Sequence, residues 1–434
     1  MKTQQIPKSA QPATMLKALL VGVEIAGSGT PPQEHSLDEL EGLARTAHYK
    51  PVGTFTQRLT SINPKTFIGK GKVEELATAV KHHEADAVIF DETLTPAQTR
   101  NLENILKCGI VDRPWIILEI FHDHARTREA KTQVDLARLK YALPRLTRMW
   151  THLSRQRGGI GMRDVGETQI QLDRRIIRDN ITKLNRKLKL IHRERQTQRK
   201  ARQGAYLVSL VGYTNVGKST LMNCLTGTDA LVEDKLFATL DSTVRKVKKN
   251  FPYPFLLADT VGLIAKLPHD LVASFKSTID EIRNANLLLH VVDISHPNFR
   301  EQLRIAEELT REMGADALPV VRVFNKIDRM AGDGDTLDHM RRQYPEAVFI
   351  SCRKGLGMDD LRKAIVKQYE ANLLSYRVEL PYPQNNLIQK IRKHALIIKE
   401  NYHQTSVTLD LRVWPQHKSK LLAVLDGHSQ LAAG

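Results

Sequence analysis

Cysteine is scarce in this chain: Cys108, Cys224 and Cys352 are the only three among 434 residues. Cysteines so few and so widely spaced exclude a disulfide framework and a structural zinc site, and they indicate a reducing compartment. We therefore expect three chemically inert thiols.

Long apolar runs are also lacking. A membrane-spanning helix needs roughly 20 apolar residues, whereas the stretch from Leu16 to Ile25 is shorter and is interrupted by Lys17 and Glu24. We interpret this stretch as a first β-strand rather than as a signal peptide. The expected location is cytoplasmic, with no more than a loose, peripheral contact to a membrane.

Acidic residues are too few to balance the basic ones, because 48 Asp and Glu face 65 Lys and Arg and leave a formal charge of +17. Such an excess attracts a polyanion, but it does not by itself separate RNA, DNA and acidic lipid. The length exceeds what one hydrophobic core usually serves, so we expect several domains.

The order of apolar and amphipathic segments predicts an α/β multidomain protein. Residues 1–125 alternate apolar runs with helical patterns, which indicates an N-terminal α/β domain with a mostly parallel sheet. Residues 204–374 show the same alternation and predict a second, doubly wound domain. Residues 375–434 combine a helical segment with a strand of alternating apolar residues, which predicts a small C-terminal α+β domain.

Residues 126–203 have a different pattern, with apolar residues spaced alternately by four and three, which predicts two helices packed along a coiled-coil type seam. The glycines between them favour an antiparallel hairpin with an irregular tip. Residues 141–203 hold 17 Lys and Arg against five Asp and Glu, too few acids for a face of paired charges. The seam positions are Ala130, Val134, Ala137 and Tyr141, then Ile177, Ile181, Leu184, Leu188 and Ile191.

If this basic hairpin contacts RNA, its arginines neutralise phosphates and its glycines let the tip approach an irregular surface. The alternative is that the hairpin only braces the domains on either side of it. The candidate RNA-binding residues are Arg155, Arg157, Gly158, Gly159, Gly161, Arg163, Arg174 and Arg175.

A second glycine-containing turn, FIGKGK from Phe67 to Lys72, opens a predicted helix in the N-terminal domain. Its amides could hold a phosphate at the helix N-terminus, but the turn lacks the length and the final Ser or Thr of a P-loop. A plain turn is the simpler interpretation.

The segment GYTNVGKS, from Gly212 to Ser219, follows an apolar strand and precedes a helix, which is the context of a phosphate-binding P-loop. In such a loop Lys218 reaches the β- and γ-phosphate oxygens and Ser219 can ligate magnesium. The residues predicted to hold the phosphates are Gly212, Tyr213, Thr214, Asn215, Val216, Gly217, Lys218, Ser219 and Thr220.

Two further motifs complete the expected phosphate and metal site. DTVG ends an apolar strand and places Asp259 where it can hold magnesium through water. FATLD offers Thr239 as the hydroxyl that joins the metal when a γ-phosphate is present, with Thr243 as the alternative. We expect Lys218 and Thr239 to take part directly in catalysis. The nucleotide-binding set here is Phe237, Ala238, Thr239, Leu240 and Asp241, with Asp259, Thr260, Val261 and Gly262.

The motif NKID identifies the base, because a carboxylate at Asp328 accepts two hydrogen bonds from guanine, a donor pair that adenine lacks. Asn325 is expected to read the other edge of the base and Lys326 to cover its face. The predicted guanine pocket consists of Asn325, Lys326, Ile327 and Asp328, closed by Ser351, Cys352 and Arg353. The expected ligands are therefore GTP and GDP.

Two residues bear on the rate of hydrolysis. Leu263 stands where many GTPases place a glutamine that orients the attacking water, so intrinsic turnover should be slow. Asn215 resembles the asparagine that in some related GTPases helps to hold a monovalent cation, which suggests stimulation by potassium; the alternative is that Asn215 only bonds its own loop.

The order and spelling of these motifs resemble the translation-factor-like class of small GTPase domains. Together with the segment RGGIGMRDVGETQIQLDRR, from Arg157 to Arg175, they closely resemble the HflX family of ribosome-associated GTPases over nearly the whole chain. The chain departs from the family at Arg163 to Gly166, which reads RDVG instead of RGPG, and at Ser351 to Arg353, which reads SCR instead of Ser-Ala-Lys.

The resemblance implies a GTPase that binds the large ribosomal subunit and its RNA and separates stalled or idle ribosomes. We also expect a monomer that uses Mg²⁺ and does not bind DNA. Two other hypotheses stay open. One is a GTPase module of an RNA-modifying system, although no cysteine nucleophile or cofactor motif lies outside the nucleotide-binding domain. The other is a peripheral membrane regulator that uses the basic hairpin to meet acidic lipid.

Overall fold

The computed structural model describes most of the chain, and all structural statements below concern the described residues. They are residues 15–26, 33–145, 169–200, 205–228, 236–237, 239–240, 242–247, 251–266, 276–330, 334–384, 386–425 and 430–433. The predicted tip residues Arg155, Arg157, Gly158, Gly159, Gly161 and Arg163, and the predicted nucleotide-binding residues Ala238 and Asp241, lie outside this set.

The N-terminal part of the chain is built on a parallel sheet with the strand order β2-β1-β3-β4. Alternate residues of β1 point to opposite faces: Leu20 packs in a core with α1 and α4, and Leu19 in another with α2 and α3. The elements are β1 (Leu16–Ile25), α1 (Gln33–Thr46), β2 (Tyr49–Leu59), α2 (Lys70–His83), β3 (Ala87–Phe90), α3 (Pro96–Leu106), β4 (Gly109–Asp112) and α4 (Arg113–His124).

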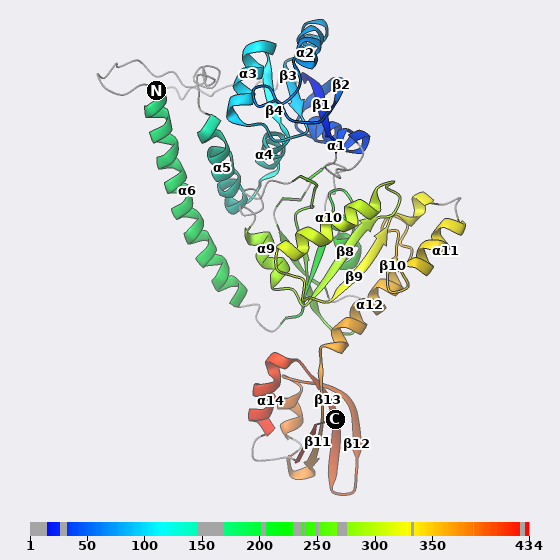
Figure 1. Ribbon diagram of the computed structural model, residues 1–434. Helices are drawn as coiled ribbons and strands as arrows, with labels where there is room; N and C mark the ends of the chain where they lie inside the picture. Colours follow the sequence, from blue (N-terminus) through cyan, green and yellow to red (C-terminus); the bar gives the residue numbers. More distant parts are fainter. Residues whose placement is uncertain are drawn as a thin grey trace, which may run out of the picture.

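Two antiparallel helices follow, α5 (Arg128–Ala142) and α6 (Gln169–Lys200), with the 3-10 turn η1 (Leu143–Arg145) after α5. They pack side by side along the predicted seam, with Val134 and Ile191 buried, and Arg195 near the end of α6 pairs with Glu129 at the start of α5. Figure 1 shows α6 as a long helix that runs from the N-terminal part along the side of the molecule.

The central part is a six-stranded sheet with the order β10-β9-β8-β5-β7-β6, parallel except for the edge strand β6. Leu210 of β5 packs with α7 and α12 on one face, and Val211 packs with α9 and α10 on the other. The elements are β5 (Leu207–Gly212), α7 (Lys218–Thr226), β6 (Thr243–Val247), β7 (Phe255–Asp259), α9 (Lys276–Arg283), β8 (Leu287–Asp293), α10 (Phe299–Glu312), β9 (Val320–Asn325), η4 (Ile327–Met330), α11 (Gly334–Gln343), β10 (Val348–Phe349) and α12 (Met358–Ala371).

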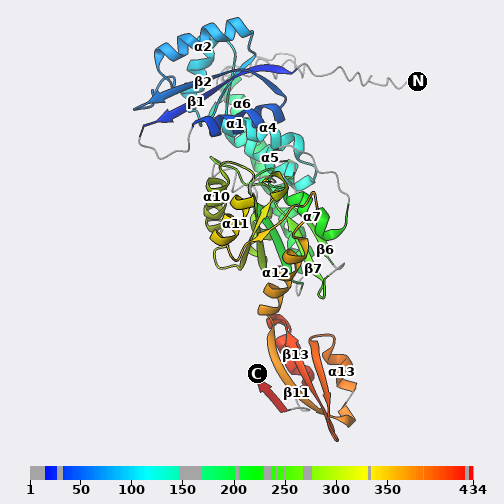
Figure 2. The ribbon, with the colours of Figure 1, turned by 90° about the vertical axis from the view of Figure 1, so that its right-hand side faces the viewer.

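The C-terminal part is an antiparallel sheet with the order β12-β13-β11-β14, whose buried face holds Val407, Leu409 and Leu411 against α13 and α14. Both ribbon views place it at the end of the molecule opposite the N-terminal sheet, beyond α12 (Figures 1 and 2). The elements are β11 (Leu374–Pro381), η5 (Tyr382–Gln384), α13 (Asn386–Ile391), β12 (Leu396–Tyr402), β13 (Ser406–Val413), η6 (Pro415–His417), α14 (Lys418–Leu425) and β14 (Gln430–Ala433).

The predicted fold class is confirmed: two α/β sheets, of which the second is doubly wound, are joined by a helical pair and followed by a small α+β unit. Within the described ranges, no helix combines the length and the apolar character needed to cross a lipid bilayer.

Candidate functional site

The predicted P-loop connects β5 to α7, and its backbone allows only glycine at two positions. Gly212 has φ of +150°, and a Cβ there would lie 2.2 Å from the carbonyl oxygen of Val291. Gly217 has φ of +94°, and a Cβ there would lie 2.4 Å from Nδ2 of Asn325. The loop is therefore packed against the neighbouring strands and leads directly into the N-terminus of α7, where backbone N–H groups attract an anion.

Lys218 begins α7, and its side chain is buried over the P-loop. Its ammonium group donates to the carbonyl oxygens of Gly212 at 3.0 Å and Tyr213 at 2.7 Å. Burial lowers the pKa of Lys218 to about 8, and the nearby carboxylate of Asp259 acts in the opposite direction. A buried ammonium group with backbone partners alone is well suited to gain an anionic partner such as a phosphate.

The three side chains predicted to hold magnesium meet at the ends of β5 and β7. The hydroxyl of Ser219 donates to Oδ2 of Asp259 at 2.6 Å and lies 2.7 Å from the hydroxyl of Thr239. The hydroxyl of Thr239 is 3.3 Å from the same carboxylate oxygen. Thr243, the alternative to Thr239, is exposed on β6.

These residues fit a magnesium ion. They offer only oxygen donors, which Mg²⁺ prefers, and Oδ1 of Asp259 is buried without a hydrogen-bond partner in the described structure. Burial raises the pKa of Asp259, while Lys218, Ser219 and Thr239 act to lower it. A divalent cation here would add positive charge beside this buried carboxylate.

The NKID motif ends β9 and holds two neighbouring loops together. Asn325 is 2% exposed; its Nδ2 donates to the carbonyl of Val216 at 2.9 Å and its Oδ1 accepts from the amide of Cys352 at 3.2 Å. Lys326 donates to the carbonyl of Asn215 at 2.8 Å and pairs with Asp293 at 2.7 Å. Asn325 therefore braces the P-loop against the loop after β10, in addition to its predicted role in reading the base.

Asp328 lies beside Ser351, whose hydroxyl donates to Oδ1 of the carboxylate at 2.5 Å. That hydrogen bond keeps the pKa of Asp328 below its usual range, so the carboxylate is ionised and able to accept hydrogen bonds. The amide of Lys354 donates to the Ser351 hydroxyl at 3.1 Å and orients it. The remaining predicted pocket residues, Ile327, Cys352 and Arg353, follow directly on these two loops.

Leu263 is built into the core beneath the P-loop. Its amide donates to the carbonyl of Gly212 at 3.0 Å, and its carbonyl accepts from the amide of Thr214 at 2.8 Å. The side chain is 5% exposed and packs with Val211 and Leu288. Leu263 therefore has neither the chemistry nor the freedom to orient a water molecule.

The other predicted residues fall on the same edge of the sheet or on α6. Thr260 donates to the carbonyl of Leu210 at 2.6 Å and joins β7 to β5. Arg174 and Arg175 lie near the start of α6. A Cβ added at Gly262 would lie 3.2 Å from Nζ of Lys218, so Gly262 borders the phosphate site. The structure also describes the predicted residues Thr220, Phe237, Leu240 and Val261.

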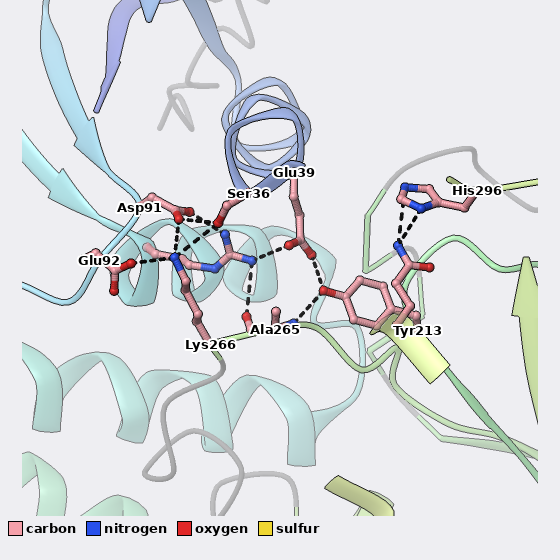
Figure 3. Close-up of polar contacts among 10 residues, drawn as sticks. Ser36, Glu39, Asp91, Glu92, Tyr213, Ala265, Lys266 and His296 are labelled. Atoms are coloured by element: carbon pink, nitrogen blue, oxygen red, sulfur yellow. Dashed lines mark hydrogen bonds and ion pairs between the residues drawn. The ribbon is translucent and has the colours of Figure 1, made fainter. Parts of the chain in front are cut away.

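A polar cluster joins this site to the N-terminal sheet (Figure 3). Arg113, at the start of α4, is 1% exposed and pairs with Glu39 at 2.8 Å and Asp91 at 2.6 Å. The hydroxyl of Tyr213 in the P-loop donates to Glu39 at 2.7 Å, and the ammonium of Lys266 donates to Asp91 at 2.5 Å. The P-loop and the segment after DTVG are thus both anchored to the N-terminal part.

The segment that carries Thr239 is anchored in the same way. The ring of Phe237 packs edge-on against Phe121 of α4 with ring centres 4.7 Å apart. The carbonyl oxygen of Phe237 also lies 2.9 Å from Nδ1 of His124.

Sequence reasoning missed these contacts. Arg113 precedes Pro114 at the start of a helix and looks like an ordinary exposed N-terminal residue, and Glu39 lies on an amphipathic helix rich in acids. A glutamate and an arginine separated by most of a domain give no local signal that they pair. The apolar length of α4, which forces that helix into the interior, is the one sequence signal that could have indicated a buried first residue.

Three protein-family models match the chain. A GTP-binding GTPase N-terminal model matches residues 34–122, a GTP-binding GTPase middle-region model matches residues 124–202, and a model described as a 50S ribosome-binding GTPase matches residues 207–326.

Relatives and solved structures are similar over most of the chain. The GTPase HflX of Flavobacterium psychrophilum is 51% identical over 387 residues, covering 84% of this chain and 92% of that protein. The GTPase HflX of Escherichia coli is 40% identical over 380 residues, covering 87% and 89%. A GTP-binding protein from the archaeon Sulfolobus solfataricus, solved with GDP, is 26% identical and covers 81% of this chain and 98% of its own, with a TM-score of 0.44.

Proposed function

Because this chain belongs to the HflX family of GTPases and hydrolyses GTP, we propose that it binds the large ribosomal subunit in its GTP-bound state and promotes the separation of ribosomes. The partner is the RNA surface of that subunit, the protein acts as a monomer in the cytoplasm, and hydrolysis to GDP ends the interaction.

One observation carries this proposal: packed elements connect the segment of Thr239, which is predicted to respond to the γ-phosphate, to the basic helix α6. Thr239 is two residues from Phe237, which packs on Phe121 of α4. Helix α4 packs on α5, and α5 packs on α6. A movement of the Thr239 segment on binding GTP would therefore reach α6 through packed side chains, which shift as units rather than deform gradually.

Helix α6 has the charge expected of an RNA-binding element. Its 32 residues include 11 Lys and Arg against three Asp and Glu. Basic residues of α6 such as Arg178, Lys183 and Lys187 are exposed, so their charge is accessible to a partner. Counterion release on binding phosphates would favour association with RNA.

The same packing argues against the membrane hypothesis. A helix that lies in a lipid interface needs a free apolar face, whereas the apolar seam of α6 is occupied: Ile177 and Ile191 are buried against the rest of the protein.

The nucleotide site supports magnesium-assisted hydrolysis of GTP. Ser219 and Thr239 would hold Mg²⁺ directly and Asp259 through water; bound there, the ion supplies positive charge to the β- and γ-phosphate oxygens. Lys218 neutralises charge on the same oxygens, and Asp328 selects guanine. Leu263 contributes no polar group, so the water must be oriented by other groups, and the large subunit is their proposed source.

Potassium is a proposed second cation, because Asn215 sits at the turn of the P-loop with φ of +59° and its carbonyl is already bonded by Lys326. Its side-chain oxygen is the group that would face the cation. Equal rates of hydrolysis in potassium and sodium would exclude this role.

The proposed separation of ribosomes is tested by sucrose-gradient profiles of intact ribosomes incubated with the protein. With GTP or a non-hydrolysable analogue we expect conversion to free subunits; with GDP we expect the intact ribosome peak to persist. An unchanged profile in all nucleotide states would contradict the proposal while leaving the GTPase assignment intact.

A further inference from the structure

Two of the three cysteines lie against each other beside the guanine pocket, although 128 positions separate them in the chain. Cys224 is in the last turns of α7, and Cys352 follows β10. The thiol of Cys224 donates to the backbone carbonyl of Cys352 at 3.4 Å.

The two thiols differ in exposure. Cys224 is partly exposed and lines a surface hollow of about 630 Å³ together with Gly355, Gly357 and Met358. Cys352 is buried, with 7% of its surface exposed. A small solute can therefore reach Cys224 first, while Cys352 is shielded behind it.

The pKa values of the two thiols differ as well, and the more exposed thiol has the lower pKa. The neighbouring Cys352 side chain lowers the pKa of the Cys224 thiol, against the opposing effect of burial. The Cys224 side chain and burial raise the pKa of Cys352. Since the thiolate is the nucleophile, Cys224 is the more reactive of the two.

We propose that Cys224 and Cys352 form a reversible disulfide when the protein meets a peroxide, and that this bond weakens guanine-nucleotide binding. The inference concerns the nucleotide site alone and holds whether or not the ribosome is the partner.

Hydrogen peroxide can serve as the two-electron oxidant that converts the two thiols into a disulfide. The Cys224 thiolate attacks one peroxide oxygen, so an S–O bond forms, the O–O bond breaks and the leaving hydroxide takes a proton to become water. The sulfur of Cys352, losing its proton, then attacks the Cys224 sulfur; an S–S bond forms and the S–O bond breaks, releasing a second water. A thiol reductant reverses the reaction.

The bond would strain the guanine pocket. Bonded sulfurs lie about 2.0 Å apart, closer than any non-bonded contact between them, so the disulfide would draw the loop after β10 toward α7. Cys352 contributes its amide to Oδ1 of Asn325 at 3.2 Å, and the preceding Ser351 bonds Asp328 at 2.5 Å. At its other end the loop packs closely on β10 at Gly357. A Cβ added to this glycine would lie 2.1 Å from the carbonyl oxygen of Phe349, so this end of the loop has little room to move. The shift therefore falls on the groups that position Asn325 and Asp328.

The first experiment maps the bond in the full-length protein. After treatment with hydrogen peroxide, remaining thiols are alkylated and the protein is digested for mass spectrometry. We expect one linked peptide pair containing Cys224 and Cys352, with Cys108 alkylated, and no linkage after dithiothreitol. Cys224→Ala and Cys352→Ala should each abolish the linkage, and Cys108→Ala is the matched control that should retain it. Absence of a Cys224–Cys352 peptide would overturn the proposal.

The second experiment measures the dissociation constant of GDP by calorimetric titration before oxidation, after oxidation and after reduction. We expect a rise of about tenfold on oxidation, equivalent to about 1.4 kcal/mol, and full recovery with dithiothreitol. Oxidised Cys108→Ala should show the same rise, and oxidised Cys224→Ala should keep the affinity that it has when reduced. A fully linked protein with the affinity of the reduced form would also overturn the proposal.

Discussion

The hydroxyl of Tyr213, in the P-loop, donates a hydrogen bond of 2.7 Å to Glu39 on α1, which lies 174 positions earlier in the chain. The same hydroxyl accepts from the amide of Ala265, three residues after DTVG, at 2.7 Å. One side chain thus connects the phosphate-binding loop, the segment that follows the metal-site aspartate, and the N-terminal sheet. The nucleotide site and the N-terminal part are therefore parts of one polar network.

The substitution Tyr213→Phe should destabilise the protein by about 1.5–3 kcal/mol, because it removes a donor to a partly buried, charged carboxylate and an acceptor for a backbone amide. The measurement is the urea unfolding midpoint. Tyr253→Phe is the control: its hydroxyl bonds Glu370 at 3.0 Å in a more exposed place, so its loss should be smaller. Equal midpoints for parent and Tyr213→Phe would show that the network does not hold the two parts together.

The substitution Gly217→Ala should severely weaken nucleotide binding, because the new Cβ would meet Nδ2 of Asn325 and the residue would be strained at its positive φ. Gly227→Ala is the control, because Gly227 also has a positive φ, of +67°, but no atom lies within 4 Å of an added Cβ. It therefore shows the effect of backbone strain without a steric clash. We expect Gly227→Ala to cost about 1 kcal/mol in stability and to bind GDP like the parent. Similar GDP affinities for the two variants would argue against the close packing of the P-loop on Asn325.

The substitution Asp328→Asn should weaken GTP binding about 100-fold through the loss of two charge-assisted hydrogen bonds, and it should admit xanthine nucleotides. The amide presents a donor where guanine also presents one and where xanthine presents an oxygen. Calorimetric titration with GTP and xanthosine triphosphate measures both effects. Asp316→Asn, exposed and ahead of β9, is the matched control. Unchanged GTP affinity would remove Asp328 from the site.

Turnover by the isolated protein should be slow, because Leu263 is buried with an apolar side chain where a water-orienting group would stand. Purified large subunits should raise the rate at least about tenfold, as an added partner does for other GTPases that lack a catalytic group. Release of phosphate with and without subunits measures the effect. Rapid hydrolysis by the protein alone, with no gain from subunits, would contradict the account.

The sequence predicted those parts of the molecule that are formed by neighbouring residues. A strand, a glycine-containing loop and a helix in direct succession predict a P-loop, because contiguous backbone amides do the binding. The position of Asp259 at a strand end also predicted that it would lie close to Ser219. In the structure the hydroxyl of Ser219 is 2.6 Å from Oδ2 of Asp259. Alternating runs of apolar residues predicted the two α/β sheets, and the fold class is confirmed.

The rest depends on contacts between distant residues, which have no local signature. Arg113 is buried only because Glu39 and Asp91 converge on it from two other elements. Likewise, three scattered cysteines predicted separate, inert thiols, whereas the fold brings Cys224 and Cys352 together at the guanine pocket. Both arrangements follow from how the helices pack on the sheets, which composition and spacing do not determine.

The most direct test is sedimentation of the protein with purified large ribosomal subunits at increasing salt, with a GTP analogue or with GDP. The account predicts cosedimentation with the analogue, little with GDP, and a steep loss with salt. Replacing both Arg174 and Arg175 by glutamine should weaken binding and reduce the salt slope by about two units, whereas the same change at Arg341 and Arg342, an exposed pair on α11, should leave both unchanged. Binding that is equal in the two nucleotide states, or insensitive to the α6 substitutions, would contradict the account.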